Sequence, residues 1–555
     1  MKRFLISSFI VGFLIMLFNS CIKDNFDFDK WDGEVEWTPS FVAPVAWGDL
    51  SILEAIEAYD STINLIANTD GYVSLLYYTN VSSRDISELI VIPDQAYFGV
   101  VNGTDIDFSE FDQNGEILSG TVNLKMGFTM FNEECEIDTI YVKSAILNSL
   151  VQSTYKHTLQ LKFTFPTIVK NGSPLQIEYF YAPVGGIDAN NDISLQGYHI
   201  DLTQTALGYN EVPVVMSYIF YHSGTPDNSG NIIFNHNFED LEYEFMSGYF
   251  GYNSIIFETD SVNIGIFKNK NLNVDEYLFQ DPKFKVRYHN SYGIPTNFFF
   301  TEMYARSKIN DQNYNIIDYE NGLPLDSLHP YFVNFPNIPW FMRDDSIVLN
   351  RFNSNIAQVI SIQPKWIQFV AHAHTNPNGT SHTNFITDQS VLVADVEVEL
   401  PLWGYIDNFH AADTSDFDFS EMYSTAQAIK RLAIRLDMTN GFPVEGYGQV
   451  YFMDENYTIL DSLLYSYQER IIPAATIGSE GQVLEYAKKV TIVEITDDRV
   501  EKIKDAKYIS YEGHSNSTEY YDDRLVKIYG EYRIKFDLSF EADIEMNVDI
   551  DTIEF

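Results

Sequence analysis

Hydrophobic and polar residues alternate along much of this chain, which is the pattern of half-buried β-strands. The alternation is longest near the end, where every even-numbered residue from Ile534 to Ile550 is apolar and every odd one between them is polar. At about 3.3 Å per residue, one strand of this length would extend to roughly 60 Å. We therefore expect either a long core strand that bends between sheets or two strands separated by a bulge. A lipid-holding groove along the even-numbered face is the functional alternative.

Turn signals separate the shorter strand segments from Tyr72 onward. Asn-Gly pairs, which adopt the positive φ angles of tight hairpins, occur at 102–103, 114–115, 171–172, 321–322 and 440–441. One short helix is expected from Leu50 to Tyr59, with Ser51 and Glu54 as its capping pair. The sequence therefore predicts an all-β fold of tandem antiparallel β-sandwich-like domains with few short helices.

A repeated segment indicates that some of these domains resemble one another. Residues 284–295 align without a gap on residues 432–443, with identical Arg, Gly and Pro positions, and residues 159–174 form a looser third copy. Each copy is typical of a strand, a Gly turn and a Pro that opens the next strand. Two interpretations stay open: a duplicated unit, or a strand–turn–strand pattern that recurs independently in a β-rich chain.

The length of 555 residues is enough for several domains at about 150 residues each. We place the boundaries where the strand pattern breaks. The expected segments are a signal peptide at 1–20, an acidic tether and extended opening at 21–45, an N-terminal β domain at 46–150, a β-sandwich-like domain at 151–320, and a β-sandwich-like domain with the long C-terminal strand at 321–555.

The first residues have the features of a lipoprotein signal peptide. Lys2 and Arg3 precede an apolar run over residues 4–18, and Ser20 leads directly into Cys21. The run is short for a membrane-spanning helix, which needs roughly 20 apolar residues. In lipoproteins the Cys at this place carries a diacylglycerol and an acyl chain. We therefore predict lipidation of Cys21, with ordinary secretion and an uncleaved anchor as the alternatives.

Composition narrows the class of partners. The formal net charge of −45 opposes binding to a phosphate backbone, so nucleic acid is excluded as a partner. Cys135 is the only other cysteine. A single remaining thiol cannot form an internal disulfide, and with no Cys–His motif around it we interpret Cys135 as structural.

The residues after Cys21 indicate where in the cell envelope the protein is located. Ile22 is not the Asp that retains lipoproteins in the inner membrane, and the acidic stretch at 23–29 resembles loosely the export tag of surface lipoproteins. We therefore expect a lipid-anchored outer-membrane protein at the cell surface, with a periplasm-facing outer-membrane protein as the alternative.

The opening motif then adds a family resemblance. Residues 37–44 read Trp-x-Pro-x-Phe-x-Ala-Pro. Together with the signal peptide and the strand–Gly–Pro segments, this motif resembles large β-rich outer-membrane lipoproteins of Bacteroidota. The resemblance implies a β-rich protein held at the outer membrane, and it implies no catalytic residue.

A histidine cluster is the main candidate for metal binding. His372 and His374 share one face of a predicted strand, and His382 follows after a short loop. If the next strand pairs with this one, the carboxylates of Asp395, Glu397 and Glu399 approach the imidazoles. Two His and a carboxylate suit zinc. The alternative is an ordinary solvated polar face with cross-strand pairs.

Two further patterns rest on common residue types. Five acidic residues lie around a Gly turn between 105 and 116, and carboxylates of this kind are calcium ligands. Because these residues lack the EF-hand spacing, we favour an acidic turn over a calcium site. Asp-Ser and Asp-Thr pairs before an apolar or β-branched residue resemble the O-glycan acceptor pattern of exported Bacteroidota proteins, and strand-entry turns use the same residues. The acceptor positions are Ser61, Thr139, Ser261, Ser327, Ser346, Ser462 and Thr552.

No catalytic motif for a serine nucleophile, a zinc peptidase or a phosphate-binding loop occurs in the sequence. The leading hypothesis is a binding or scaffolding lipoprotein, an accessory of an outer-membrane transport or assembly complex, with no cofactor beyond the lipid at Cys21. A glycan-binding surface lipoprotein predicts exposed aromatic residues such as Trp340 in a concave site. A hydrolase without a recognisable motif predicts one deep pocket with perturbed carboxylates.

Overall fold

The alternating segments fold as antiparallel strands, so the expectation of an all-β fold is confirmed. Among the described residues, the α-helices with described bounds are α3 (Ile356–Ile360) and α5 (Asp497–Ile503), and Ile52 and Glu54 are also helical. None of these described helical segments is long or apolar enough to cross a membrane. The computed structural model describes residues 34–37, 40–52, 54, 64–81, 90–182, 186–187, 191–205, 208–224, 228–257, 259–267, 272–319, 323–324, 330–380, 383–417, 429–466, 469–544 and 546–549.

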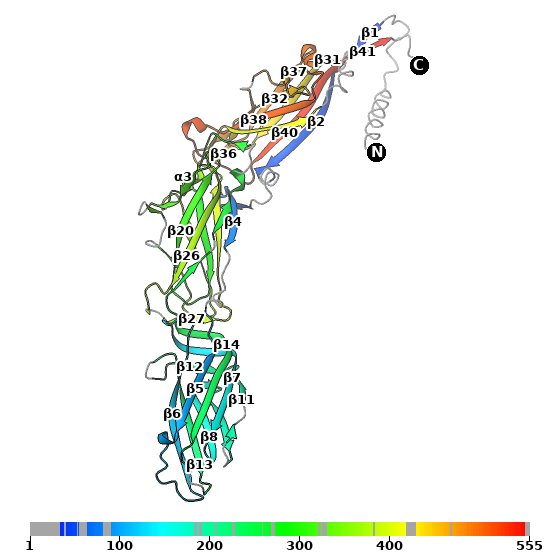
Figure 1. Ribbon diagram of the computed structural model, residues 1–555. Coiled ribbons are helices and arrows are strands. Elements are labelled where there is room, and N and C mark those ends of the chain that lie inside the picture. Colours follow the sequence, from blue (N-terminus) through cyan, green and yellow to red (C-terminus); the bar gives the residue numbers. More distant parts are fainter. Residues whose placement is uncertain are drawn as a thin grey trace, which may run out of the picture.

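Three β-sandwiches follow one another along an elongated molecule (Figure 1). We call them the distal domain (residues 90–250), the middle domain (64–81 and 253–401) and the base domain (40–51 and 402–544). Beyond the base domain, β1 (Glu34–Trp37) pairs with β41 (Met546–Asp549), so both ends of the described chain lie at the same end of the molecule.

Each domain contains eight strands that pair in the same order. The first, eighth, third and sixth strands form one sheet, and the second, seventh, fourth and fifth form the other. This connectivity defines a jelly roll, a double-sheet sandwich. In the base domain the two sheets are β2 (Ser40–Ser51), β40 (Arg533–Ile544), β31 (Ile429–Asn440), β37 (Ala487–Ile495), and β30 (Phe409–Asp416), β38 (Tyr508–Ser517), β32 (Val444–Met453), β33 (Ile459–Ser462).

The middle and distal domains repeat this order strand for strand. In the distal domain, β12 (His199–Asp201) pairs with both β7 (Glu136–Ser153) and β8 (Thr158–Lys170) and joins the two sheets along one edge. The middle sheets are β4 (Val73–Val81), β28 (Leu392–Pro401), β19 (Lys283–Asn290), β25 (Arg343–Leu349), and β16 (Asp260–Asn263), β26 (Pro364–Thr375), β20 (Thr296–Ser307), β21 (Asn313–Asn315). The distal sheets are β5 (Gln95–Asn102), β14 (Asn231–Tyr249), β7 (Glu136–Ser153), β11 (Asn191–Ser194), and β6 (Ile117–Gly127), β13 (Glu211–Tyr221), β8 (Thr158–Lys170), β9 (Ser173–Tyr181).

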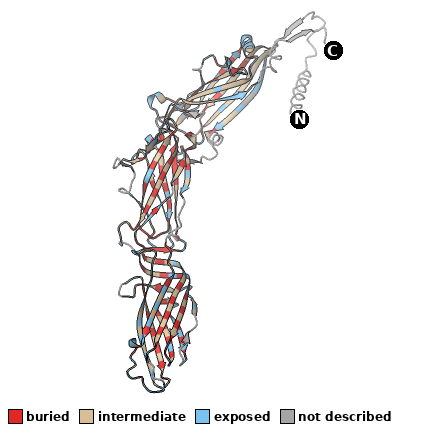
Figure 2. Ribbon diagram, in the orientation of Figure 1, coloured by how far each residue is buried: buried red, intermediate tan, exposed pale blue. Residues whose placement is uncertain are grey.

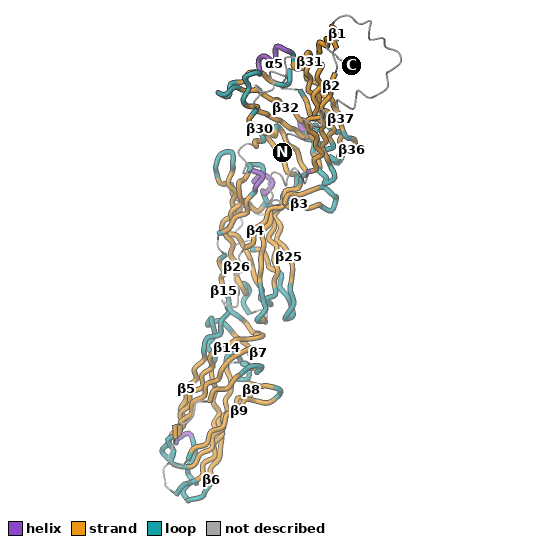
Figure 3. Tube along the Cα trace, turned by 90° about the vertical axis from the view of Figure 1, so that its right-hand side faces the viewer, coloured by secondary structure: helices purple, strands orange, loops and turns teal. Residues whose placement is uncertain are grey.

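Short elements complete the domains. The 3-10 helices are η3 (Gly103–Asp105), η4 (Gly265–Phe267) and η5 (Tyr520–Asp522). The remaining short strands are β3 (Asn64–Ala67), β10 (Gly186–Ile187), β15 (Asn253–Ile256), β17 (Leu272–Asn273), β22 (Ile317–Asp318), β23 (Leu323–Pro324), β24 (Tyr331–Val333), β34 (Arg470–Ile472), β35 (Thr476–Ile477) and β36 (Val483–Glu485). Figure 3 shows strands running through all three domains from a second direction.

The three domains are nested in the sequence rather than consecutive. The middle domain is inserted between the first and second strands of the base domain, and the distal domain is inserted at the same place in the middle domain. The expected boundaries therefore need correction. The cut between 150 and 151 falls inside β7, the cut at 46 falls inside β2, and residues 320–321 lie outside the described residues.

The aligned repeat occupies equivalent places in two domains. Residues 284–295 lead from β19 to β20, and residues 432–443 lead from β31 to β32, which are the third and fourth strands in each case. At the turn a side chain on Gly293 would meet the ring of Phe385, and one on Gly441 would meet Tyr486. The looser copy at 159–174 is not in the equivalent place. It runs from the fourth strand β8 to the fifth strand β9, one strand later than the other two copies.

The long alternating segment near the C-terminus forms two strands with different partners, which is the second of the two arrangements expected from the sequence. β40 pairs with β2 and β31 within the base domain, whereas β41 pairs with β1 beyond it. At the end of β2, Ser51 and Glu54 form the expected capping pair, with the Ser51 N–H donating to Glu54 Oε2 at 2.7 Å. Ile52 and Glu54 are helical, and the rest of the expected helix, residues 53 and 55–59, lies outside the described residues.

Continuous hydrogen bonding crosses the joint between the distal and middle domains. β27 (Asn384–Thr387), which belongs to the middle part of the chain, pairs with β14 of the distal domain. Asn384 and Asn376 are both buried and exchange two amide hydrogen bonds, at 2.8 and 3.0 Å. The Phe250 N–H also donates to Asn384 Oδ1 at 3.0 Å. These bonds satisfy the polar groups that the joint buries.

The joint between the middle and base domains is a small sheet shared by both. β18 (Glu276–Phe279) pairs with β29 (Trp403–Asp407), which pairs with β39 (Val526–Lys527). An antiparallel bridge between Tyr72 and Tyr529 extends this contact. Both joints are therefore made of backbone ladders rather than of single-stranded linkers.

Buried apolar residues are concentrated in the distal and middle domains (Figure 2). In the distal core, His236 is fully buried among Phe163, Phe165 and Phe234. Its Nδ1 lies 2.8 Å from Ser149 Oγ. Burial lowers the pKa of His236 to about 4, so the imidazole is neutral in the folded state at neutral pH.

We expect the substitution Asn384→Ala to destabilise the joint between the distal and middle domains by roughly 3 kcal/mol. It removes the partners of the Phe250 N–H and of Asn376 Oδ1, and an unsatisfied buried polar group costs about 1–3 kcal/mol. Urea denaturation of the two proteins measures the difference. Asn378→Ala, at an exposed position of the same loop, is the matched control. Equal midpoints for Asn384→Ala and Asn378→Ala would contradict the role of this amide pair.

A second prediction concerns acid stability. The folded pKa of His236 lies below the ordinary value of 6.5, so the unfolded chain takes up this proton first. The stability from the neutral imidazole is present above 6.5 and is lost as the pH falls toward about 4, a loss of roughly 3 kcal/mol. His236→Gln cannot ionise. We expect the stability advantage of the parent over this variant to shrink by that amount in denaturation curves recorded between about pH 7 and pH 4, and a constant advantage would refute the prediction.

Candidate functional site

A cluster of metal-ligating side chains lies on the outward face of a base-domain sheet. His410 projects from β30, and Glu512 and His514 project from the neighbouring strand β38. One ligand atom from each residue lies within 4.8 Å of the others, and all three residues are half-buried. The two imidazole rings are stacked with their centroids 4.5 Å apart.

Antiparallel pairing of β30 and β38 brings these residues together. His410 is directly opposite His514, and Glu512 is opposite Ala412, one step along the same face. Residues two apart on a strand share a face, and directly opposite side chains are close enough to contact. The cluster therefore follows from the register of two strands that are far apart in the sequence.

A hydrogen-bond chain orients the His514 ring. Asn408 Nδ2 donates to Asp275 Oδ2 at 2.6 Å, which fixes the amide so that its oxygen points toward His514. Asn408 Oδ1 then accepts from His514 Nδ1. Because Nδ1 carries the proton in this arrangement, Nε2 is the basic nitrogen of the ring. Burial, followed by the nearby His410, lowers the pKa of His514 and favours its neutral form.

The histidines expected to bind metal lie in the middle domain. His372 and His374 are on the face of β26 that points away from the core, opposite Phe369 and Ile367 on the buried face, as the period-two pattern predicted. Both imidazoles pack against Phe299, with ring centroids 5.5 and 4.9 Å away. His382 lies outside the described residues.

The expected approach of carboxylates to these histidines is wrong. Asp395, Glu397 and Glu399 are on β28, which pairs with β19 and β4, whereas β26 belongs to the opposite sheet. The expectation assumed that successive strands pair, and the jelly roll places these two strands in different layers. Glu397 and Glu399 meet cations on β19 instead.

These two glutamates form a buried ionic network with Lys285 and Arg287. Glu397 and Glu399 are nearly inaccessible to solvent, and Lys285 Nζ contacts both, at 3.0 Å from Glu397. Arg287 makes a second ion pair with Glu397 at 2.7 Å. Burial alone would raise the pKa of Glu399, but the hydrogen bond and charge of Lys285 outweigh it and lower that pKa. We interpret the network as structural, because removal of one partner would leave a buried charge unpaired.

The predicted covalent sites fall in different settings. Cys21, Ser61, Ser327 and Thr552 lie outside the described residues. Ser346 is exposed on β25, whereas Thr139, Ser261 and Ser462 are half-buried. Thr139 Oγ1 is also within hydrogen-bond distance of His199 Nε2. Ser346 is therefore the most accessible of the four described acceptor positions.

The two remaining sequence interpretations concern Cys135 and the acidic turn. Cys135 is buried, and burial raises the pKa of its thiol to about 12, which suits a structural residue. In the acidic turn, Asp105, Asp107 and Glu116 each accept hydrogen bonds from nearby backbone N–H groups. These carboxylates thus stabilise the loop at the far end of the distal domain.

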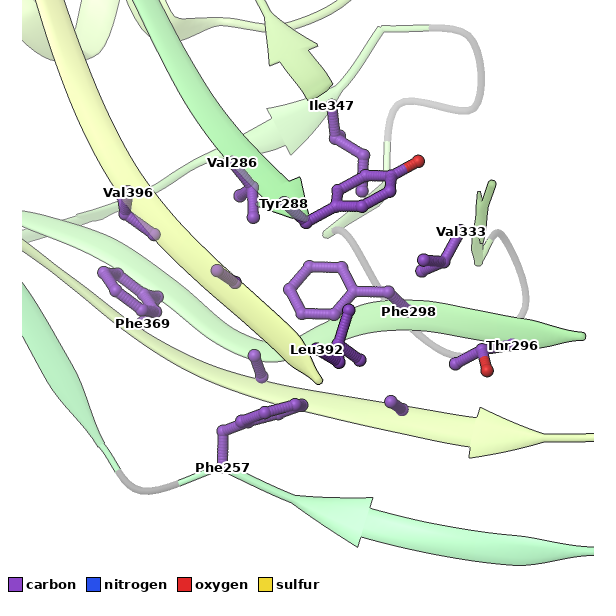
Figure 4. A pocket seen from close by; sticks show the side chains of 13 residues that line it. Phe257, Val286, Tyr288, Thr296, Phe298, Val333, Ile347, Phe369, Leu392 and Val396 are labelled. Atoms are coloured by element: carbon purple, nitrogen blue, oxygen red, sulfur yellow. The ribbon is translucent and has the colours of Figure 1, made fainter. Parts of the chain in front are cut away.

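Two apolar cavities among the described residues are small, whereas two larger hollows of about 330 and 340 Å³ on the distal domain are lined partly by charged side chains. One of about 30 Å³ lies inside the middle domain between Phe257, Tyr288 and Phe298 (Figure 4). Another, of about 100 Å³, lies at the joint between the middle and base domains and is lined by Trp403 among others. Trp340 is 61% exposed but stacks on Phe245 across the other joint, and it lines neither cavity.

Sequence reasoning missed the cluster of His410, Glu512 and His514. The only local signal is Glu-x-His at 512–514, which places both side chains on one face of a strand. His410 is about a hundred residues earlier, and only the strand pairing connects it to the other two.

Comparisons with known proteins provide little further guidance. The chain matches no protein-family model and no curated protein. Among solved structures, a Parabacteroides distasonis protein inferred to be secreted has 14% identity and a TM-score of 0.27, over 54% of this chain and 88% of that chain. A structure of infectious bursal disease virus has 7% identity and a TM-score of 0.14, over 88% and 82% of the two chains. PNGF-II has 8% identity and a TM-score of 0.15, over 65% and 83%.

Proposed function

We propose that this protein is a lipid-anchored outer-membrane protein that carries a binding or scaffolding surface on its distal domain, as an accessory subunit of an envelope transport or assembly complex. One observation carries the proposal. The two ends of the described chain pair at one end of the molecule, and the domain inserted deepest in the sequence lies at the opposite end. A lipid on Cys21 would therefore attach the base end to the membrane and leave the distal domain remote from it.

The joints support a spacer role. Backbone ladders cross both joints, from β27 to β14 and through β18, β29 and β39. An ion pair between Lys143 and Asp388, at 2.9 Å, adds to the first joint. Two domains that share a sheet resist bending better than two domains joined by one flexible linker.

Apolar residues on the distal domain support a contact surface there. Phe98 on β5 is 67% exposed and Phe180 on β9 is 62% exposed. Among the described strands, β5 pairs only with β14 and β9 only with β8, so both are edge strands. Exposed aromatic residues beside an unpaired strand edge are suited to protein contacts. The charge of −45 favours a partner surface that is not itself acidic.

Substitution of the predicted lipidation site tests the anchor. We expect the parent to sediment with membranes and to be released by detergent but not by high salt, because two or more acyl chains hold durably in a bilayer. We expect Cys21→Ser to appear in soluble fractions instead. Cys135→Ser, which leaves the predicted lipid attachment in place, is the control. Membrane sedimentation of Cys21→Ser equal to that of the parent would overturn the anchor.

Site-specific proteolysis of intact cells tests orientation. A protease recognition sequence is inserted between Gly224 and Asn228 of the distal domain, or between Ser466 and Glu469 of the base domain. A distal domain held outside the cell predicts faster cleavage at the distal site than at the base site. Protection of both sites until the cells are lysed would assign the protein to the periplasmic face, and faster cleavage at the base would contradict the proposed arrangement.

A further inference from the structure

We propose that His410, Glu512 and His514 form a binding site for one divalent transition-metal ion, with zinc as the probe. The site is independent of the proposed function, because it lies on the side of the base domain and not on the distal domain. It is also separate from the histidines that the sequence singled out, which are on β26 of the middle domain.

The donor set suits such an ion. Two imidazole nitrogens and one carboxylate oxygen are common zinc ligands, with metal–ligand distances of about 2.0–2.2 Å. Two atoms bound to the same ion are therefore at most about 4.4 Å apart. The ligand atoms already lie within 4.8 Å of one another, so small side-chain rotations are enough to close the site. Three protein ligands leave a further position for water or for a ligand from a partner.

The surroundings of the cluster provide a second argument. Metal-binding imidazoles usually donate their other N–H group to an acceptor that fixes the ring. His514 has this arrangement, because Asn408 Oδ1 accepts from Nδ1 and Asp275 in turn accepts from Asn408 Nδ2. Asn408 holds its place with a φ of +48°, a conformation that Asn tolerates better than most residues. The basic Nε2 of His514 is the ligand atom that this chain presents.

A bound ion would stabilise a part of the molecule with few buried apolar residues. Among the described residues, the buried members of the apolar cluster next to β38 are Phe452, Ile503 and Ala506. The ligands come from two neighbouring strands, so an ion bound by all three would link β30 to β38. Through Asn408 and Asp275 it would also act on the segment that leads into β18 at the joint with the middle domain.

Histidines elsewhere provide matched controls. His289 on β19 contacts Asp344 on β25 at 2.6 Å, which is an imidazole with a carboxylate across a strand pair but without a second imidazole. His372 belongs to the other histidine pair, whose rings pack against Phe299. His289→Gln and His372→Gln therefore remove a strand histidine without touching the proposed ligands.

The test measures zinc bound to the full-length, detergent-solubilised protein after removal of metal with a chelator. Equilibrium dialysis is expected to show one equivalent of bound zinc for the parent, for His289→Gln and for His372→Gln. We expect His410→Gln and His514→Gln to lose this equivalent. Asn408→Gly, which keeps the positive φ but removes the amide, should bind zinc roughly 10–100-fold more weakly.

A second readout separates loss of the site from loss of the fold. Urea denaturation midpoints recorded with and without zinc should rise with zinc for the parent and the two controls, and should not change for His410→Gln or His514→Gln. Absence of bound zinc in the parent, or unchanged binding in both ligand variants, overturns the proposal. Loss of zinc from His372→Gln alone would move the site to the middle domain and equally overturn it.

Discussion

Pairing of the first strand with the last strand is the constraint on which the architecture depends. β2 pairs with β40, β4 with β28 and β5 with β14, so each jelly roll begins and ends with neighbouring antiparallel strands. A whole domain can then be inserted after a first strand without disturbing either sheet. The same pairing brings distant segments together in stages. Folding of the continuous distal domain pairs residues 95–102 with residues 231–238 and so shortens the effective loop between the first and second strands of the middle domain. This lowers the entropic cost of closing the middle domain, and the middle domain does the same for the base.

The stiffness of the molecule depends on whether the polar groups buried at the joints between domains are hydrogen-bonded. At the distal joint the amides of Asn376 and Asn384 satisfy each other, and a four-residue ladder between β27 and β14 continues a sheet from one domain into the next. At the other joint, a small sheet contains strands from both sides. Because bending at a joint would break several backbone hydrogen bonds of its ladder, the ladders oppose changes in the relative orientation of neighbouring domains.

Period-two alternation and Asn-Gly turns were enough to predict the fold class, and the aligned segments 284–295 and 432–443 correctly marked equivalent strands in two domains. The boundaries could not be predicted in the same way. A strand such as β2 carries no local sign that its partner lies almost five hundred residues later, in β40. The cut inside β7 shows the difficulty, because a single continuous strand of the distal domain was divided between two expected domains.

The order of strand pairing also explains which part of the candidate site could be predicted from the sequence. Strand periodicity correctly placed His372 and His374 on one face, but the carboxylates were assigned to them by proximity in sequence. In a jelly roll, successive strands often cross to the opposite sheet, and neighbours are instead nested pairs: first with eighth, second with seventh. His410 is on a second strand and His514 on a seventh strand. A search for ligand sets in such a chain therefore has to compare strands that are neighbours in this pairing order, such as the second and seventh of each unit, because that pairing places distant histidines on one face.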